Sequence, residues 1–463
     1  MQALTSRLAE KNTIRLTPRL FATTSLSLFT IGLSVHYIRT ALTSRSSLTT
    51  FSTPHGALAL APPGFKQEPH NLLVIPGPIE VSDEVLYANA HPSVGHTAPA
   101  FAAVFQDCLK MIKQVLYTTS AQPFLVAGSG TLGWDMVASN LVEPGEDVLV
   151  LNSGYFGDAF ADCLEVYGAK VDQVKAPIGD RPGPAEIESA LSQKKYKLVT
   201  FTHVDTSTGV LSDAKAICAA VKKVSPDTLT ILDGVCAVAS EEIRMDDWGV
   251  DVVISASQKG LGVPPGLSVT VASERAMAVL AARKTPVTSY FASWRRWLPI
   301  MQAYGKGQAA YFATPPTNLI WAFQASLRAI TEQSPSLEQR FALHKESSLR
   351  LKQAVNDLGL KQVPLHPDAS ANGMTAIYVP SPLKPSDIVP KMLKKGIVVA
   401  AGLHKDIKET YIRVGHLSIT AIDAKRGDID RVIKALQESF AEAGWDGSKT
   451  SSRPSVVEHQ GQA

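Results

Sequence analysis

Uniformly apolar segments alternate with helix-like segments between about residues 124 and 275, and this alternation restricts the fold more than any other feature. Asp147–Leu151, Leu198–Thr202 and Leu229–Leu232 have the composition of buried strands. Between such segments apolar residues recur at helical spacing, as at Leu132 and Met136. Strands that are apolar throughout are buried on both faces, and strands joined by helices run parallel. The sequence therefore predicts an α/β fold with a mostly parallel sheet between helices.

The pattern changes near Ser334. A long helix-like stretch, Leu337–Leu358, precedes three strand-like segments and a last helix near residues 428–443, which is typical of a smaller α+β domain. We expect four parts in the chain. They are an N-terminal targeting extension (1–66), a large domain (67–330), a small C-terminal domain (331–446) and a disordered tail (447–463).

Composition excludes several classes of protein. The chain has 463 residues, 45% of them hydrophobic, and 45 Lys and Arg against 42 Asp and Glu, a formal net charge of +3. This small surplus gives no reason to expect a nucleic-acid partner. The four cysteines lie far apart without CxxC or Cys/His spacing, so we expect neither a disulfide framework nor a metal site.

The first fifty residues differ in composition from the rest. They contain six Lys or Arg, one acid and seventeen Ser or Thr. Such a composition is typical of a mitochondrial transit peptide. Residues 20–35 are sixteen uncharged positions, fewer than the roughly 20 needed to span a bilayer. We therefore predict a mitochondrial presequence. The alternatives are a membrane anchor at residues 20–35, the only part expected to contact a membrane, and a peroxisomal or cytosolic location.

Three features at predicted strand ends indicate a cofactor. Lys259 follows the apolar run Asp251–Ile254, and Asp233 ends the strand-like Leu229–Leu232. Gly128–Thr131 lies at a strand-to-helix junction, where backbone N–H groups can bind a phosphate. Each feature alone is commonly structural, as a packed lysine stem, a turn cap or an ordinary junction.

Together these features match pyridoxal phosphate. The amine of Lys259 suits its aldehyde, the carboxylate of Asp233 suits its ring nitrogen, and the helix N-terminus suits its phosphate. Because parallel strands end at one sheet edge, one crevice can collect all three groups.

From Leu72 to about Leu436 the chain also resembles the alanine:glyoxylate aminotransferases of the fungal type, which are class V, fold type I pyridoxal-phosphate enzymes. Eight blocks in order carry the resemblance. They are LLVIPGP (72–78), GHTAPAF (95–101), FLVAGSGTLGWD (124–135), THVDTSTGVLSD (202–213), ILDGVCAV (231–238), SASQKGLGVPPGLS (255–268), YFATPP (311–316) and YIRVGHLS (411–418).

The resemblance implies roles for individual cofactor-binding residues. Lys259 would form the Schiff base and Asp233 would pair with the ring nitrogen. Phe156 would stack on the ring and Thr206 would contact its phenolic oxygen. Without the resemblance, the last two would be read as a core side chain and a turn cap. The residues implied to hold the phosphate are Gly130, Thr131 and Gln258, with Tyr311 and Thr314 reaching it from the neighbouring subunit of a homodimer.

The resemblance also implies how substrates bind. Arg413 would bind the substrate carboxylate, which suits its planar fork, and His96 would line the entrance or cap a turn. Ala237 stands where the family often has serine, which leaves the amino donor open. The implied reaction is a ping-pong transamination from L-alanine to glyoxylate, giving pyruvate and glycine, with Lys259 and Asp233 catalytic.

Other activities remain as alternatives. Serine could replace alanine as the donor to pyruvate or glyoxylate. A cysteine desulfurase of the same fold is disfavoured because all four cysteines precede residue 240. Gly128, Gly130 and Gly133 also fit the G-x-G-x-x-G pattern of NAD-type dehydrogenases, but the next predicted strand ends without the acidic residue that such sites use.

Overall fold

The computed structural model describes residues 64–447 and residue 453. The predicted targeting extension lies almost entirely outside the described residues, and so does most of the predicted tail. Within residues 64–447, no helix combines the length and the apolar character that a membrane crossing requires.

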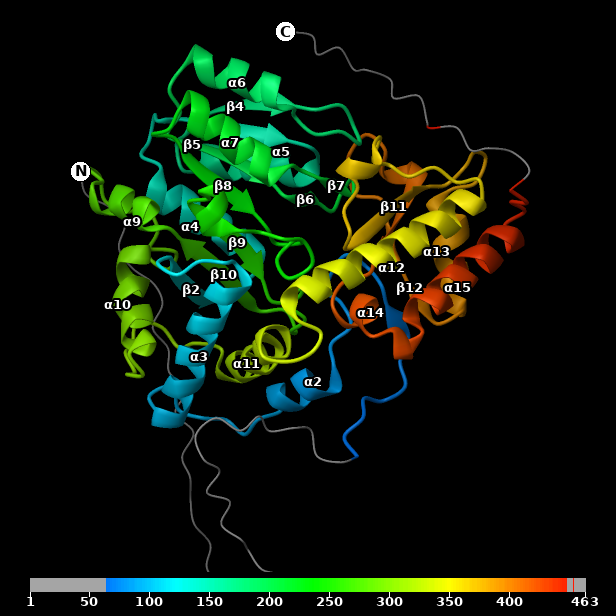
Figure 1. Cartoon of the computed structure of the whole chain (residues 1–463), viewed down its shortest axis with the longest axis horizontal. Coiled ribbons are helices and arrows are strands. Elements are labelled where there is room, and N and C mark those ends of the chain that lie inside the picture. Colours follow the sequence, from blue (N-terminus) through cyan, green and yellow to red (C-terminus); the bar gives the residue numbers. More distant parts are fainter. Residues whose placement is uncertain (1–63, 448–452, 454–463) are drawn as a thin grey trace, which may run out of the picture. The chain divides into compact units, whose positions relative to one another are not determined.

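A seven-stranded sheet forms the centre of the larger part of the structure (Figure 1). Its strand β10 is antiparallel to both neighbours, and the other six strands run in one direction. The inner strands are buried along almost their whole length, so both faces are covered, as the apolar runs predicted. In sheet order the strands are β2 (Gln122–Ala127), β10 (Leu267–Ala272), β9 (Val252–Ala256), β8 (Leu229–Asp233), β5 (Leu198–Thr202), β3 (Asp147–Asn152) and β4 (Lys170–Lys175).

Helices surround this sheet and share its hydrophobic core. They form where apolar residues recur with helical period; in α3, for example, Phe101, Phe105 and Ile112 all face the core. The helices are α2 (Asp83–Asn89), α3 (Pro99–Val115), α4 (Gly130–Leu141), α5 (Tyr155–Val166), α6 (Pro184–Gln193), α7 (Ala214–Val224), α8 (Met245–Trp248), α9 (Glu274–Ala281), α10 (Trp294–Gly305) and α11 (Thr317–Thr331). The short strands β6 (Val204–Asp205) and β7 (Val210–Leu211) form a separate hairpin.

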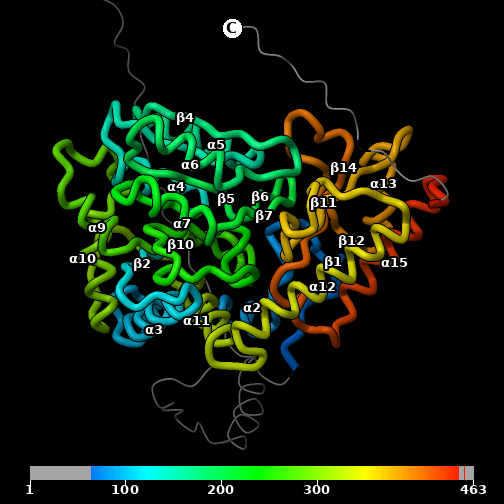
Figure 2. The backbone as a smooth tube through the Cα atoms, turned by 45° about the horizontal axis from the view of Figure 1, so that its top comes forward, coloured from blue at the N-terminus to red at the C-terminus, as the bar shows by residue number. Residues whose placement is uncertain are grey.

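A second hydrophobic core lies among the C-terminal elements, and the first strand of the chain joins it. Strand β1 pairs with β12 in parallel, so the blue start of the chain lies among orange and red elements in Figures 1 and 2. The elements are β1 (Leu72–Leu73), α12 (Leu337–Asp357), β11 (Met374–Tyr378), α13 (Pro385–Lys394), β12 (Ile397–Val398), β13 (Ala400–Ala401), β14 (Tyr411–Gly415), α14 (Ile419–Ile422) and α15 (Asp428–Glu442). The domain limits drawn from the sequence stay a prediction.

Candidate active site

One cavity opens where the parallel strands end. Seven predicted site residues line it, and each lies at or just after the carboxyl end of a strand, where an α/β sheet forms its ligand crevices. They come from the ends of β2, β3, β5, β8 and β9. The seven are Gly130, Thr131, Phe156, Thr206, Asp233, Gln258 and Lys259. The structure brings these residues together, and their individual roles stay predictions.

Asp233 is the last residue of β8 and its carboxylate is buried. Oδ2 accepts a hydrogen bond from the indole Nε1 of Trp134 at 2.9 Å, and Oδ1 accepts one from the backbone N of Val235 at 3.0 Å. Burial raises the pKa of Asp233 to about 6. Among the described residues no cation forms an ion pair with it, so this oriented carboxylate suits a bound group that carries a positive nitrogen.

Lys259 lies in the same cavity without a carboxylate partner among the described residues. Its Nζ donates to the carbonyl of Pro76 at 2.8 Å, and burial lowers its pKa. A lowered pKa favours the neutral amine, which is the form that attacks a carbonyl. The residue after Pro76 must be glycine: Gly77 has a φ of +127°, and a Cβ there would lie 2.4 Å from Cδ of Lys259.

The N-terminus of α4 forms the end of the cavity that suits a phosphate. Ser129 precedes the helix, and its side chain makes no capping hydrogen bond, so the first N–H groups of the helix stay open to a ligand. A side chain at Gly130 would place its Cβ 2.7 Å from Cγ2 of Val235. In the same lining, Oε1 of Gln258 and the hydroxyl of Thr202 are buried and have no hydrogen-bond partner among the described residues. These unpaired groups fit a phosphorylated ring better than an empty apolar pocket.

Phe156 and Thr206 come from segments that are bonded to each other. Phe156 is in the first turn of α5, and its backbone N donates to Oδ2 of the buried Asp205 at 3.2 Å. The ring of Phe156 meets that of Trp134 edge to face, with centroids 6.4 Å apart. Thr206 follows Asp205 directly. One carboxylate therefore sets the spacing between the two residues that are predicted to contact the cofactor ring.

Arg413 lies beside this cavity, on β14, and is not part of its lining. Its Nη1 donates to the carbonyl of Thr206 at 3.2 Å and its Nε to the carbonyl of Ala401 at 2.8 Å. Its remaining guanidinium N–H groups bond to no residue that the structure describes and can therefore donate to a carboxylate. The structure thus bonds this arginine directly to Thr206, which lines the cavity.

The other predicted residues lie away from the cavity lining. His96 and Tyr311 contact each other, with ring centroids 5.0 Å apart, and Tyr311 is 63% exposed. Thr314 is also exposed. Within the described residues, the structure therefore does not bring these three side chains into the cavity lining, and their roles stay predictions.

Sequence reasoning missed several residues of the lining. Trp134 lies one helical turn beyond Gly130 within one of the eight blocks, so its spacing could have shown that it faces the site. Cys236 also lines the cavity, and its thiol donates to the Pro76 carbonyl that holds Lys259. Its neighbour Ala237 is fully buried outside the lining, so the residue where the family often has serine does not face the cofactor side directly.

Replacing Asp233 with Asn is expected to change how the stability of the cofactor-free protein depends on pH. The pKa of Asp233 is about 6 in the folded protein and 3.8 for the free acid. The ionised carboxylate therefore destabilises the fold above about pH 6. Below about pH 4 the group is protonated in both the folded and the unfolded state, and this destabilisation is absent. Ionisation of Asp233 lowers the free energy of unfolding by about 3 kcal/mol in total. Measured by urea unfolding, the free energy of unfolding of Asp233→Asn relative to wild type should rise between these pH values.

A matched control is Asp251→Asn. Asp251 is also buried, but Nε of Arg275 donates to its Oδ1 at 2.8 Å, so the substitution breaks an ion pair and should destabilise. If the stability difference between Asp233→Asn and wild type stays constant with pH, Asp233 is not a buried acid with a raised pKa.

Comparison with known proteins identifies the family. Residues 80–418 match the model of the class-V aminotransferases. Alanine–glyoxylate aminotransferase 1 of Saccharomyces cerevisiae is 46% identical over 360 residues, which cover 75% of this chain and 92% of the yeast protein. L-aspartate–glyoxylate aminotransferase of Paracoccus denitrificans is 32% identical over 75% of this chain and 86% of its own length.

A solved structure agrees. The crystal structure of an alanine–glyoxylate aminotransferase from Nostoc sp. superposes with a TM-score of 0.75 at 28% identity, covering 81% of this chain and 96% of the other. The resemblance found in the eight sequence blocks is thereby confirmed, and so is the fold predicted from the alternating pattern. The chain belongs to the class-V aminotransferases, and it is a fold type I enzyme that uses pyridoxal phosphate.

Proposed function

We propose that the protein transfers the amino group of L-alanine to glyoxylate and so forms pyruvate and glycine. The observation that carries the proposal is the placement of Lys259, Asp233 and the α4 N-terminus in one cavity, with Arg413 directly beside it. The yeast relative supports the choice of substrates, because its name specifies this reaction and the match covers 92% of its length.

The residues of the cavity fit the cofactor group by group. Pyridoxal phosphate supplies an electron sink for the bonds at the substrate Cα. Lys259 would bind its aldehyde carbon and Asp233 would hold a proton on its ring nitrogen. Phe156 would cover one face of the ring, and Thr206 would donate to its phenolic oxygen. The phosphate would be held by the N–H groups at Gly130 and Thr131 and by the amide of Gln258.

Lys259 has two tasks in this proposal. It holds the cofactor before the substrate arrives, and once displaced its Nζ can take the proton from the substrate Cα. Burial lowers its pKa, so the amine is ready to accept that proton. Arg413 binds the substrate carboxylate, a group that alanine and glyoxylate share, so one residue can serve both halves of a ping-pong reaction.

Absorption spectra of the purified protein loaded with pyridoxal phosphate test this function. L-Alanine should bleach the visible band of the bound cofactor, and glyoxylate should restore it. Lys259→Ala should show no such band and lose several orders of magnitude in rate, since it loses both tasks of the lysine. If serine or aspartate bleaches the band and alanine does not, the enzyme is a transaminase with another donor. If no amino acid changes the band, the proposed reaction is wrong.

We further propose that two copies form a homodimer with shared sites. Tyr290 and Tyr311 are 68% and 63% exposed. The ring of Tyr290 lies 5.5 Å from that of Phe312, and the guanidinium of Arg296 lies 3.9 Å from the Tyr290 ring. An exposed patch of aromatic residues and arginine is typical of a protein interface. It lies next to the two residues, Tyr311 and Thr314, that are predicted to act across the dimer.

Mixing two inactive variants tests the shared site. Lys259→Ala and Tyr311→Ala copies, refolded or coexpressed together, should give hybrids in which one site has both wild-type residues. Activity well above that of either variant alone is expected if Tyr311 completes the partner's site. No recovery, with dimers confirmed by sedimentation, would place Tyr311 in its own subunit's site or outside the reaction.

Mitochondrial import remains a proposal that rests on composition. Residues 1–66 fused to a fluorescent reporter should direct it to mitochondria, because transit peptides are read through their basic, acid-poor amphipathic character. The matched control replaces the six basic residues of positions 1–50 with glutamine and should stay in the cytosol. A cytosolic signal from the unchanged segment would contradict the proposal.

A further inference from the structure

Two side chains on one face of β14 hold the same two segments of the chain. Tyr411 and Arg413 are two residues apart on the strand and therefore point to the same side. Each donates to a carbonyl of the segment Thr206–Ser207, which belongs with the sheet, and each also bonds to residues 401–404 of the C-terminal part. The substrate arginine and the tyrosine thus form parallel links between these segments.

The hydroxyl of Tyr411 uses its full hydrogen-bonding capacity in a fully buried position. It accepts from the backbone N of Leu403 at 2.8 Å and from that of His404 at 2.9 Å, and it donates to the carbonyl of Ser207. Removing this one oxygen leaves three backbone groups without their partner. Such unpaired buried groups are costly, so the segments would move to find water or other partners.

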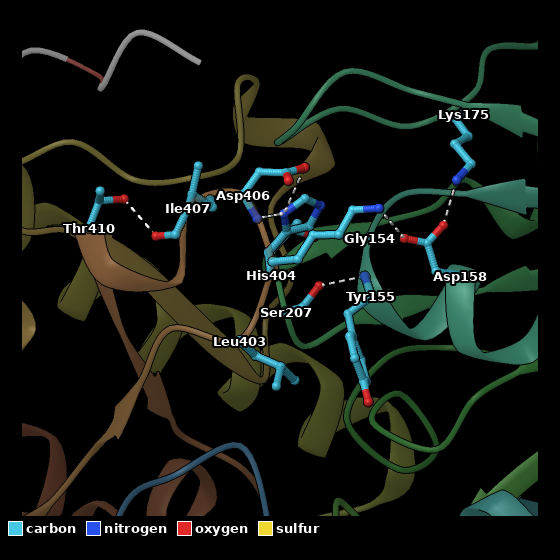
Figure 3. Close-up of polar contacts among 12 residues, drawn as sticks. Gly154, Tyr155, Asp158, Lys175, Ser207, Leu403, His404, Asp406, Ile407 and Thr410 are labelled. Carbon is cyan, nitrogen blue, oxygen red and sulfur yellow. Dashed lines mark hydrogen bonds and ion pairs between the residues drawn. The ribbon is translucent and has the colours of Figure 1, made fainter. Parts of the chain in front are cut away.

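The segment on the sheet side is fixed independently. Oδ1 of Asp205 accepts from the hydroxyl of Ser207 at 2.6 Å, and Oδ2 accepts from the backbone N of Phe156. Figure 3 shows the further bond in which Ser207 Oγ accepts from the backbone N of Tyr155, at 2.9 Å. Residues 205–207 are therefore tied to the start of α5 and provide a rigid reference beside the cofactor cavity.

On the other side, Ala401 is held in β13 by its pairing with β14, and the residues directly after that strand have weaker anchors apart from Tyr411. Lys405 lies 3.9 Å from Asp158, which is also paired with Lys175 at 2.7 Å (Figure 3). Both lysines are more than half exposed, and exposed ion pairs contribute little. The backbone carbonyl of Ala401 nevertheless has to be in place, because it orients Nε of Arg413. The buried Tyr411 hydroxyl fixes Leu403 and His404, directly after β13, and so adds a second link to the ladder that holds Ala401.

We propose that Tyr411 is a positioning residue that sets the guanidinium of Arg413 for the carboxylate shared by the amino-acid and oxo-acid substrates. The inference rests on the proposed function in one respect, namely that Arg413 binds that carboxylate. Tyr411 itself is not part of the cavity lining. Its hydroxyl ties Ser207 to Leu403 and His404, and so sets the distance between the two segments whose Thr206 and Ala401 carbonyls hold the arginine.

Tyr411→Phe in the cofactor-loaded enzyme should raise KM for both the amino acid and the oxo acid by about tenfold or more, as expected for lost buried hydrogen bonds. The affinity for pyridoxal phosphate should be unchanged. Tyr378→Phe is the matched control: Tyr378 is the buried register partner of Tyr411 on β11, and its hydroxyl bonds to no residue that the structure describes. This control should leave both KM values as in wild type.

A double-mutant cycle separates positioning from general destabilisation. If Tyr411 acts through Arg413, Tyr411→Phe should add little to KM in an Arg413→Lys background, where the oriented fork is already lost. Additive effects would overturn the proposal. So would an equal loss of cofactor affinity in Tyr411→Phe, since that would indicate a merely structural role.

Binding of propionate gives a readout without catalysis. Propionate has the carboxylate of alanine and no amine, so its displacement of alanine and its effect on the cofactor spectrum report on the carboxylate site alone. Tyr411→Phe should weaken propionate and leave the spectral response to ethylamine, which has no carboxylate, as in wild type. Equal propionate affinity in both proteins would refute the role of Tyr411.

These outcomes are distinguishable from failure of the proposed function. If wild type rejects alanine yet uses another amino acid, the same comparison is made with that donor. Should Tyr411→Phe fail to fold, Leu403→Pro is the second variant. It lies outside β14 and removes one of the three hydrogen bonds of the Tyr411 hydroxyl, because proline has no N–H. A smaller rise in KM is expected. Unchanged KM in a folded Leu403→Pro enzyme would count against the link.

Discussion

Two groups of opposite charge, the carboxylate of Asp233 and the amine of Lys259, are buried in one cavity without pairing with each other. Burial raises the pKa of the acid and lowers that of the amine, so burial disfavours the charged form of each group. A salt bridge would satisfy both and would leave neither free for chemistry. The separation is maintained because Trp134 and Val235 hold the carboxylate while the Pro76 carbonyl holds the amine. A ligand with both a ring nitrogen and an aldehyde relieves both groups at once, and pyridoxal phosphate is such a ligand.

The position of the Pro76 carbonyl depends on elements far from it in sequence. Strand β1 pairs with β12 in the second core, and the chain then passes close to β14. A Cβ at Gly415 would lie 2.2 Å from the carbonyl oxygen of Ile75, so only glycine allows this approach. Lys259, which follows β9, is consequently held by a segment that belongs with the C-terminal elements. The lysine and the second core cannot be displaced independently.

Local sequence patterns predicted the sheet and the strand ends well. The apolar composition of a strand indicates that it is buried, and parallel strands end at one edge of the sheet. Asp233 and Lys259 could therefore be assigned to one crevice from their positions in the sequence. Contacts between distant segments leave no such local signal. The hydrogen bond from Trp134 to Asp233 joins residues 99 positions apart, and the helical spacing around Trp134 does not indicate that Asp233 is its partner. Arg413 could be identified only through the family resemblance, since its place beside Thr206 depends on how β14 packs.

The residues predicted to contact the cofactor and the substrate belong to different parts of this chain, and both parts are bonded to residues 205–207. Phe156, Asp233 and Lys259 come from the sheet, whereas Arg413 comes from a strand of the C-terminal elements. The backbone of residues 205–207 is bonded to both sides, through Asp205 to α5 and through Ser207 to Tyr411. If Arg413 binds the carboxylate as proposed, substitutions in β14 alter carboxylate binding while the cofactor stays in place. A shift of residues 205–207, in contrast, affects both sides. It moves the side chain of Thr206, which is predicted to contact the cofactor ring, together with the Thr206 carbonyl that accepts from Arg413.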